Sequence, residues 1–108
     1  MQPYKGHHNY NKTSVMLFAP DTIGVYYCGI VNSSNSLSPL YIGRAIGENV
    51  TIRSRLFDHL NNDSWSGVTH FGYIICQTPR EAEIFEASEI KRFQPRYNVQ
   101  GKKIGGPV

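Results

Sequence analysis

The sequence predicts a small α+β domain, in which helices pack against a short, mainly antiparallel, three-stranded sheet. Its 108 residues leave room for one domain, since domains typically hold about 100–150 residues. The hydrophobic fraction is 40% and the charged fraction is 18%, which is the balance of a globular chain and not of a disordered one. Strand-like and helix-like segments follow one another in the order strand, strand, helix, strand, helix.

Three segments have the composition of strands. Residues 23–31 and 40–42 are rich in β-branched and aromatic residues and are joined by a polar loop that ends near Pro39, which predicts a hairpin with a long connection. A third strand is expected over residues 70–77.

The first helix is expected over residues 50–60. Ile52, Leu56 and Leu60 recur there at a four-residue spacing, which places them on one face of a helix. The polar run that starts at Asn61 is expected to end it.

The second helix has a strong start signal at Thr78. Pro79 takes the first helical position, and Glu81 lies three residues after Thr78, as in a capping box. The helix is expected to end near Phe93, because the residue before Pro95 disfavours helical backbone.

The two ends of the chain are expected to lie outside the domain. Residues 1–20 are expected to form a flexible N-terminal arm, because their first part is polar and rich in Asn, His and Lys. The domain then spans residues 21–100, and residues 101–108 form a C-terminal tail.

The formal net charge of +3 is too small to establish nucleic-acid binding, but the charges are unevenly placed. Four of the eight acidic residues fall between Glu81 and Glu89. Residues 90–108 hold no acid and these bases: Lys91, Arg92, Arg96, Lys102 and Lys103. A basic end can lie along a phosphate backbone, but a solubilising surface explains the same charges, so charge alone leaves both interpretations open.

The apolar segments and the cysteines of the sequence indicate the cellular compartment of the protein. No apolar run approaches the ~20 residues that a membrane-spanning helix needs, and residues 1–14 lack the apolar core of a secretory signal. Cys28 and Cys76 lie in apolar segments without CxxC spacing, which indicates buried free thiols in a reducing compartment. A disulfide between the two cysteines is the alternative interpretation if their strands are neighbours. We therefore expect a cytoplasmic protein that does not contact a membrane.

Side chains of three kinds are candidates for chemistry. Arg55 and His59 lie one turn apart on the edge of the first helix, where they either grip a phosphate and handle a proton or face solvent. Glu86 and Glu89 both fall in the core-facing arc of the last helix, and periodicity alone does not choose between them. A carboxylate there must reach solvent, be paired or bind a metal. The strands add tyrosines, whose hydroxyls matter only if they converge on an ionic site: Tyr26, Tyr27 and Tyr41.

Together these residues resemble the GIY-YIG nuclease family, closest in style to the nuclease domain of the bacterial excinuclease incision subunit. The two-part signature of the family is matched by Gly24-Val25-Tyr26 and Tyr41-Ile42-Gly43. Its later blocks are matched by Arg55-Leu56-x-x-His59-Leu60, by Glu86 followed by Ile90-Lys91, and by Pro95-Arg96-Tyr97-Asn98. The resemblance covers residues 24–98, and its elements come in the right order on the expected secondary structure. In this register Glu86 matches the metal-binding glutamate of the family and Glu89 does not.

The sequence departs from the family pattern in two places. Val25 replaces isoleucine, which conserves the shape of the side chain. The interval between Tyr41 and Arg55 is longer than in the excinuclease domain by Ile46-Gly47-Glu48-Asn49, which we interpret as a longer loop before the helix. Arg44 follows the second signature where many relatives have lysine.

The resemblance implies a metal-dependent endonuclease that hydrolyses DNA phosphodiester bonds, one strand per active centre. The implied catalytic residues are Tyr26, Tyr41, Arg55, His59, Glu86 and Asn98. The glutamate would bind one Mg²⁺ or Mn²⁺, and the arginine would pair with the phosphate. A tyrosine or the histidine would take the proton of the attacking water. Tyrosine is a poor base unless its pKa falls, so Arg44 and Arg55 are expected to lower it, while Asn98 would position the phosphate or the tail.

DNA is expected to be held mainly through its backbone phosphates, because no helix has the character of a major-groove reader. The expected contacts are Arg44, Arg53, Lys91, Arg92, Arg96, Lys102 and Lys103. A double-strand break would need a homodimer or two successive cleavage events. A partner that targets the chain to its substrate is a further alternative. Two other interpretations remain, which are an inactive nucleic-acid-binding module of the same fold and an interaction domain that has the motif by chance. The presence of every key residue favours the enzyme.

Overall fold

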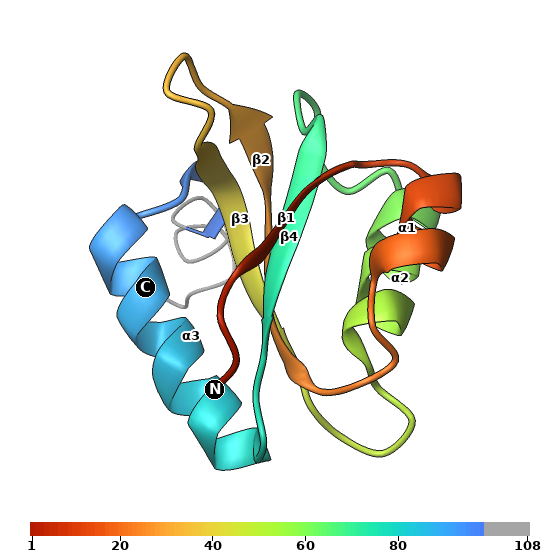
Figure 1. The fold of residues 1–108 in the computed structure, drawn as a ribbon, viewed down its shortest axis with the longest axis vertical. Helices are drawn as coiled ribbons and strands as arrows, with labels where there is room; N and C mark the ends of the chain where they lie inside the picture. The colour runs from red at the N-terminus through yellow and green to blue at the C-terminus, as the bar shows by residue number, and fades with distance from the viewer. Residues whose placement is uncertain (99–108) are drawn as a thin grey trace, which may run out of the picture.

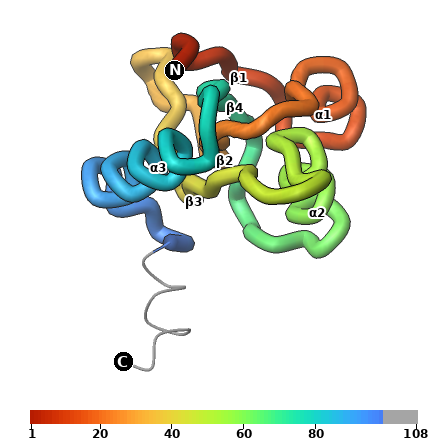
Figure 2. The backbone as a smooth tube through the Cα atoms, turned by 90° about the horizontal axis from the view of Figure 1, so that it is seen from below, coloured from red at the N-terminus to blue at the C-terminus, as the bar shows by residue number. Residues whose placement is uncertain are grey.

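The computed structural model describes residues 1–98, and within them a four-stranded antiparallel sheet lies between helices on both faces (Figures 1 and 2). The strands follow the order β1-β4-β2-β3 across the sheet. The elements along the chain are β1 (Lys5–Asn9), α1 (Lys12–Phe18), β2 (Gly24–Val31), β3 (Leu37–Ala45), α2 (Ile52–Asn61), β4 (His70–Ile75) and α3 (Pro79–Phe93). The predicted α+β class and the order of the predicted elements are confirmed.

Strand β2 lies at the centre of the fold, because its side chains point alternately toward the helices on the two faces of the sheet. Tyr26 and Cys28 are fully buried in the core cluster that faces α1 and α2. Val25 and Tyr27 are buried in the other cluster, which packs against α3. A strand covered on both faces becomes a nearly continuous apolar run, which is why residues 24–28 lack the polar alternation of a half-exposed strand.

The expected three-stranded sheet and flexible arm are wrong, because the N-terminal segment belongs to the fold. Strand β1 pairs with β4 and adds a fourth strand. Helix α1 begins at the cap Asn11, whose side chain accepts a 2.8 Å hydrogen bond from the Ser14 amide. Val15 of α1 is fully buried. An edge strand is half exposed and tolerates polar residues such as those of β1, so its composition resembles that of a loop.

Strand β3 is longer than the expected residues 40–42, because it continues through Pro39. Proline cannot donate a ladder hydrogen bond and is tolerated only at edges and bulges. Both conditions hold here, since β3 is an edge strand and its register with β2 shifts between Cys28 and Gly29, which pairs with Pro39.

Helix α3 begins at the expected residue, and α2 begins at Ile52, two residues after the expected start. Thr51 caps α2 and exchanges hydrogen bonds with Ser54 in a capping box. Thr78 caps α3 with a 3.1 Å bond from the Glu81 amide. The expected reciprocal bond of Glu81 goes to the amide of Gln77, one residue before the cap. The prediction of a capping box at Thr78 is therefore only half correct.

The two cysteines are free and buried, as predicted. Cys28 lies in the cluster under α1 and α2, whereas Cys76 lies in the cluster under α3. The sheet separates the two thiols, so a disulfide between them is not formed. Within residues 1–98, no helix combines the length and the apolar character needed to cross a bilayer.

The packing of α1 predicts a stability difference between two neighbouring residues. Val15→Ala should lower the free energy of unfolding by about 2 kcal/mol, because it removes two buried methyl groups. Met16→Ala is the control, since Met16 is 57% exposed and should change stability little. Urea denaturation checks both variants, and equal, negligible effects would mean that α1 does not pack on the sheet.

Candidate active site

Four of the six predicted catalytic residues line one cavity of about 400 Å³, together with Arg44. Tyr26 comes from β2 and Tyr41 from β3, while Arg55 comes from α2 and Glu86 from α3. Ile46 and Val50, which lie in the longer interval before α2, complete the wall. Residues that lie 60 positions apart in the sequence therefore share one solvent-accessible site.

The pairing of β2 with β3 brings the two tyrosines together. Tyr26 lies opposite Gly43, and Cys28 lies opposite Tyr41, so both tyrosines point to the same face of the sheet. Their ring centroids are 6.2 Å apart. A Cβ atom on Gly43 would come within 2.5 Å of the Tyr26 hydroxyl, so only glycine lets the Tyr26 ring cross its neighbour here.

His59 does not line the cavity but supports it through Tyr26. The Tyr26 hydroxyl and His59 Nε2 are 2.9 Å apart, and His59 Nδ1 is 3.2 Å from the Ser64 hydroxyl. Burial, assisted by the charge of Arg55, lowers the pKa of His59 to about 4. The ring is therefore neutral at pH 7, so one nitrogen donates and the other accepts. In the tautomer with the proton on Nδ1, Nδ1–H donates to Ser64 and Nε2 accepts from Tyr26.

The tyrosines do not have the lowered pKa that the sequence led us to expect. Burial is the largest influence on both hydroxyls and raises the pKa of Tyr26 and of Tyr41. The charge of Glu86 raises the pKa of Tyr41 further. The Arg55 guanidinium acts in the opposite direction on both hydroxyls, but desolvation is the larger effect. Both hydroxyls are protonated hydrogen-bond donors at neutral pH.

The structure separates the two glutamates that periodicity could not. Glu86 faces the cavity, where Oε1 accepts a 2.7 Å hydrogen bond from the Arg44 guanidinium and the side chain is 13% exposed. Glu89 lies one turn further along α3 and faces a different cavity, where it accepts a 2.6 Å bond from the Tyr27 hydroxyl. Glu86 is thus the carboxylate that shares a site with Tyr26.

The donor atoms in the cavity fit a hard divalent cation that keeps most of its water. Within residues 1–98 there is no group of three or more His, Cys, Asp or Glu side chains that could hold a metal ion. A single carboxylate, complemented by water and substrate phosphate, is a common way to bind Mg²⁺. Glu86 supplies that carboxylate, with one of its oxygens paired to Arg44.

Asn98 lies outside the cavity and has a different contact from the one expected. Its Oδ1 accepts a 2.8 Å bond from the Ile42 amide, and its Nδ2 donates a 2.9 Å bond to the Ile42 carbonyl. The side-chain amide thus forms hydrogen bonds with the backbone N–H and C=O groups at the free edge of β3, as a further strand would. Because Ile42 lies between Tyr41 and Gly43, Asn98 is a positioning residue for this stretch of β3.

Sequence reasoning missed Trp65. Its ring lies 4.2 Å from the ring of His59 and 4.6 Å from that of Tyr41, between centroids. The next residue, Ser66, is tied down because its carbonyl accepts a 2.7 Å bond from the Tyr97 hydroxyl. The one tryptophan of the chain, in a polar loop directly after the helix of Arg55 and His59, is a signal that could have found it.

The basic residues expected to contact DNA have different surroundings within the described part of the chain. Arg44 lines the cavity. The Arg53 side chain bonds the Ala19 carbonyl at 3.0 Å, and Arg92 pairs with Glu89 beside the other cavity. The remaining expected contacts are Lys91 and Arg96, which are exposed, and Lys102 and Lys103, which lie outside the described residues.

Comparison with known proteins relates this geometry to a family, although no protein-family model matches the chain. UvrABC system protein C of Thermotoga petrophila is 33% identical over 93 residues, which are 81% of this chain and 15% of that protein. The chain therefore spans a small part of the length of this relative.

Solved structures of a single domain match over nearly the whole domain. The GIY-YIG N-terminal endonuclease domain of UvrC from Thermotoga maritima, bound to magnesium as its catalytic divalent cation, is 28% identical with a TM-score of 0.57. The match covers 80% of this chain and 93% of that one. A point mutant of the same domain, bound to its catalytic divalent cation, is 29% identical with a TM-score of 0.62 over 80% and 92% of the two chains. By sequence and by fold, the chain belongs to the GIY-YIG nuclease family.

Proposed function

We propose that the chain is a metal-dependent endonuclease that hydrolyses DNA phosphodiester bonds, one strand per active centre. The convergence of Tyr26, Tyr41, Arg55 and Glu86 on one cavity carries this proposal. Cleavage of a phosphodiester needs an activated water, compensation of the phosphate charge and support for the leaving oxygen. The cavity offers a group of the right type for each of these needs.

Glu86 would hold one Mg²⁺ or Mn²⁺ in this mechanism. When bound, such an ion supplies Lewis-acid stabilisation of the phosphate charge. Arg55 pairs with non-bridging phosphate oxygens, as a planar guanidinium does well. Arg44, which holds Glu86 at 2.7 Å, orients that carboxylate and adds a second positive charge beside the phosphate.

Tyr26 and His59 act together on the proton of the attacking water. The Tyr26 hydroxyl is protonated, so it can take a proton only if it gives its own away. His59 Nε2 is neutral and 2.9 Å away, and it accepts the Tyr26 proton as Tyr26 takes one from water. Tyr41 lies beside this pair and donates a hydrogen bond to the phosphate or the water.

DNA would be held mainly through its backbone, and Arg44 and Arg55, which line the cavity, would lie nearest the reacting phosphate. Cleavage of both strands would need a second copy of the chain or a second encounter. The buried free thiols support the cytoplasmic location that the sequence predicts.

The first test concerns Glu86. Glu86→Gln should abolish nicking of supercoiled DNA in Mg²⁺ while the thermal unfolding midpoint is kept, because amide oxygen is a much weaker ligand than carboxylate. Glu89→Gln is the matched control on the same helix, and it should leave most activity in place. Inactivation by Glu89→Gln together with full activity of Glu86→Gln would contradict the proposal.

Arg55 should contribute to the transition state more than to binding. We expect Arg55→Ala to lower kcat by about 100- to 1000-fold, because it removes a donor aimed at developing charge, and to weaken DNA affinity much less. Arg53→Ala, two residues earlier on α2, should leave kcat nearly unchanged, since its guanidinium bonds Ala19. Single-turnover cleavage and binding in Ca²⁺ separate the two effects, and a pure loss of affinity in Arg55→Ala would refute this role.

The environment of His59 predicts how stability depends on pH. The pKa of His59 is about 4 in the fold and would be about 6.5 in the unfolded chain, so the unfolded chain binds more protons between these values. Stability should therefore fall as the pH is lowered from about 6.5 to 4.

His59→Gln should reduce this slope, and part of it should remain because burial also lowers the pKa of His8. Urea midpoints of the wild-type chain and of His59→Gln at several pH values test this. A wild-type chain whose stability is constant between pH 7 and 4 would show that His59 is not buried against Tyr26.

A further inference from the structure

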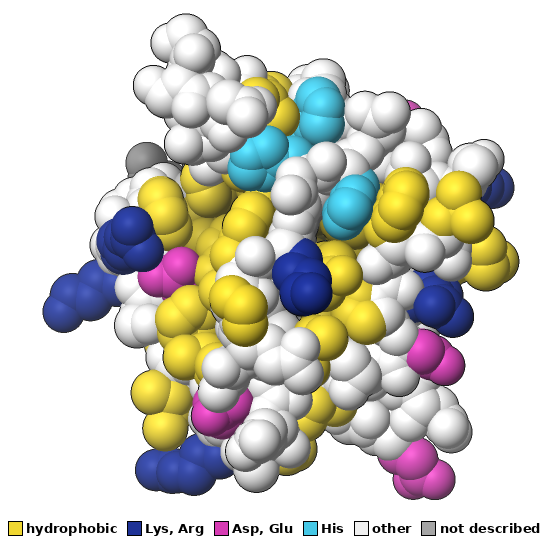
Figure 3. Space-filling model, viewed as in Figure 1, with side chains coloured by type: hydrophobic (Ala, Val, Ile, Leu, Met, Phe, Trp, Pro, Cys, Tyr) yellow, Lys and Arg dark blue, Asp and Glu magenta, His cyan; other side chains and the backbone are white. Residues whose placement is uncertain are grey.

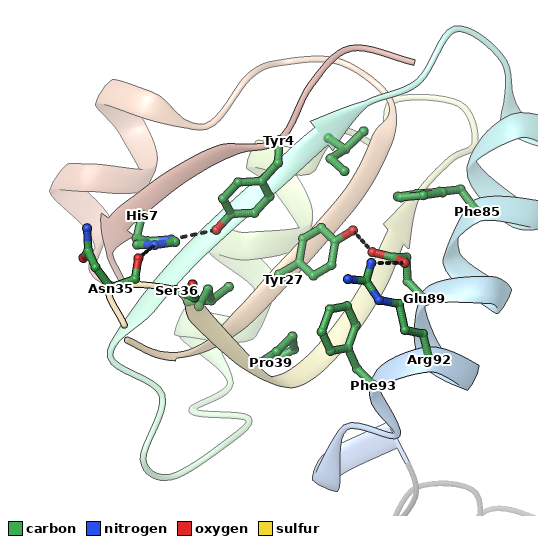
Figure 4. Close-up of a pocket in the computed structure, with 12 residues that line it drawn as sticks. Tyr4, His7, Tyr27, Asn35, Ser36, Pro39, Phe85, Glu89, Arg92 and Phe93 are labelled. Atoms are coloured by element: carbon green, nitrogen blue, oxygen red, sulfur yellow. Dashed lines mark hydrogen bonds and ion pairs between the residues drawn. The ribbon is translucent and has the colours of Figure 1, made fainter. Parts of the chain in front are cut away.

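A second cavity, also of about 400 Å³, lies between the sheet and α3 and has no part in the proposed cleavage (Figure 4). It is bounded by the segment that leads into β1, by the tip of the β2–β3 hairpin and by α3. Its walls are largely aromatic, and a carboxylate lies among them: Tyr4, Tyr27, Phe85, Phe93 and Glu89. In the space-filling view, apolar side chains gather between β1 and α3 (Figure 3).

The aromatic wall is held in place by specific contacts. The rings of Tyr4 and Tyr27 meet edge to face, with centroids 5.6 Å apart. The Tyr4 hydroxyl bonds His7 Nδ1 at 2.9 Å, and His7 Nε2 reaches the Asn35 carbonyl at the hairpin tip, also at 2.9 Å. A Cβ atom on Gly72 would overlap the Tyr4 hydroxyl, so the glycine makes room for this ring. The cavity is therefore built into the fold.

Glu89 gives this apolar cavity a negative charge. The residue is only 7% exposed, and its close hydrogen bond comes from the neutral Tyr27 hydroxyl at 2.6 Å. Burial raises the pKa of Tyr27 strongly, so the hydroxyl stays a donor. A carboxylate has about four acceptor positions and is costly to bury without a close positive partner. Aromatic faces and a buried carboxylate together favour a cation.

Arg92 of the same chain shows which cation the cavity can accept. Its guanidinium lies 4.5 Å from the centroid of the Phe93 ring and 3.4 Å from Glu89 Oε2 (Figure 4). A charge-assisted N–H···O bond is normally about 2.7–2.9 Å long, so this contact is a loose one. The Arg92 side chain is also 69% exposed. Arg92 thus covers the mouth of the cavity and leaves its interior accessible.

We propose that this cavity is a docking site for an arginine side chain of a partner protein, which inserts between Tyr4, Tyr27 and Phe93 and pairs with Glu89. A guanidinium matches both features, because its plane stacks on aromatic rings and its N–H groups form a fork toward a carboxylate. Arg92 must move aside when the partner binds. Glu89 lies one turn from Glu86 on α3 but lines a different cavity, so the inserted arginine and the reacting phosphate would occupy separate cavities.

The proposal can be tested without metal or DNA, so its outcome does not depend on the nuclease function. The probe is the blocked tripeptide acetyl-Gly-Arg-Gly-amide, titrated into the whole chain and followed by amide chemical shifts. The same peptide with citrulline in place of arginine is the control, since citrulline has the shape of arginine without the charge. Shifts at Tyr4, Tyr27 and Glu89 with the arginine peptide alone are the expected result.

Two variants locate the binding. Arg92→Ala should tighten binding severalfold, because the competing guanidinium is removed. Glu89→Gln should weaken it about tenfold or more, as the loss of a charged hydrogen bond does. If Glu89→Gln fails to fold, Phe93→Ala replaces it, because Phe93 is 38% exposed and contributes little to the core.

Three results would overturn the proposal. They are equal binding of the citrulline peptide, equal binding of a lysine peptide, and the absence of shifts in these residues even with Arg92→Ala. Shifts at the same residues with a single-stranded oligonucleotide but not with the arginine peptide would also overturn it and would assign the cavity to nucleic acid.

Discussion

The register between β2 and β3 is the constraint on which the rest of the molecule depends. It places Tyr26 opposite Gly43 and turns Tyr26 and Tyr41 to one face of the sheet, while Tyr27 and Ile42 turn to the other. A slip of one residue would exchange these faces and bury the wrong tyrosines. Two features at this edge of the sheet support the register. One is the bulge at Pro39, and the other is the pair of hydrogen bonds between the Asn98 side chain and the backbone of Ile42.

Burial decides the electrostatics of the active site. The same packing that lowers the pKa of His59 raises the pKa of Tyr26, so the two side chains share a hydrogen bond as neutral partners. Arg55 counteracts the shift at Tyr26 without reversing it. Neither ring is charged before the reaction, and a proton that passes from Tyr26 to Nε2 of His59 turns the imidazole into an imidazolium. Trp65 contributes by covering the His59 and Tyr41 rings and shielding them from water.

Local chemistry in the sequence was enough to predict α2, α3 and the central strands, but it missed α1. Helical periodicity and capping residues such as Thr78 act over a few positions, so they can be read directly. The register of the family motif also identified Glu86, which faces the same cavity as Tyr26. The errors come from long-range packing, which no local pattern encodes. The β1 edge strand is polar, the Trp65 loop meets its partners only in three dimensions, and the tyrosine pKa depends on burial.

The proposed function requires a divalent cation at Glu86, beside Tyr26 and Arg55. Titration of the chain with Mn²⁺, followed by paramagnetic broadening of its amide resonances, tests this most directly. We expect broadening to be strongest around Arg44 and Glu86 and to reach Tyr26, and we expect Glu86→Gln to abolish it. Broadening centred on His7 and His8, or broadening that survives unchanged in Glu86→Gln, would contradict the claim.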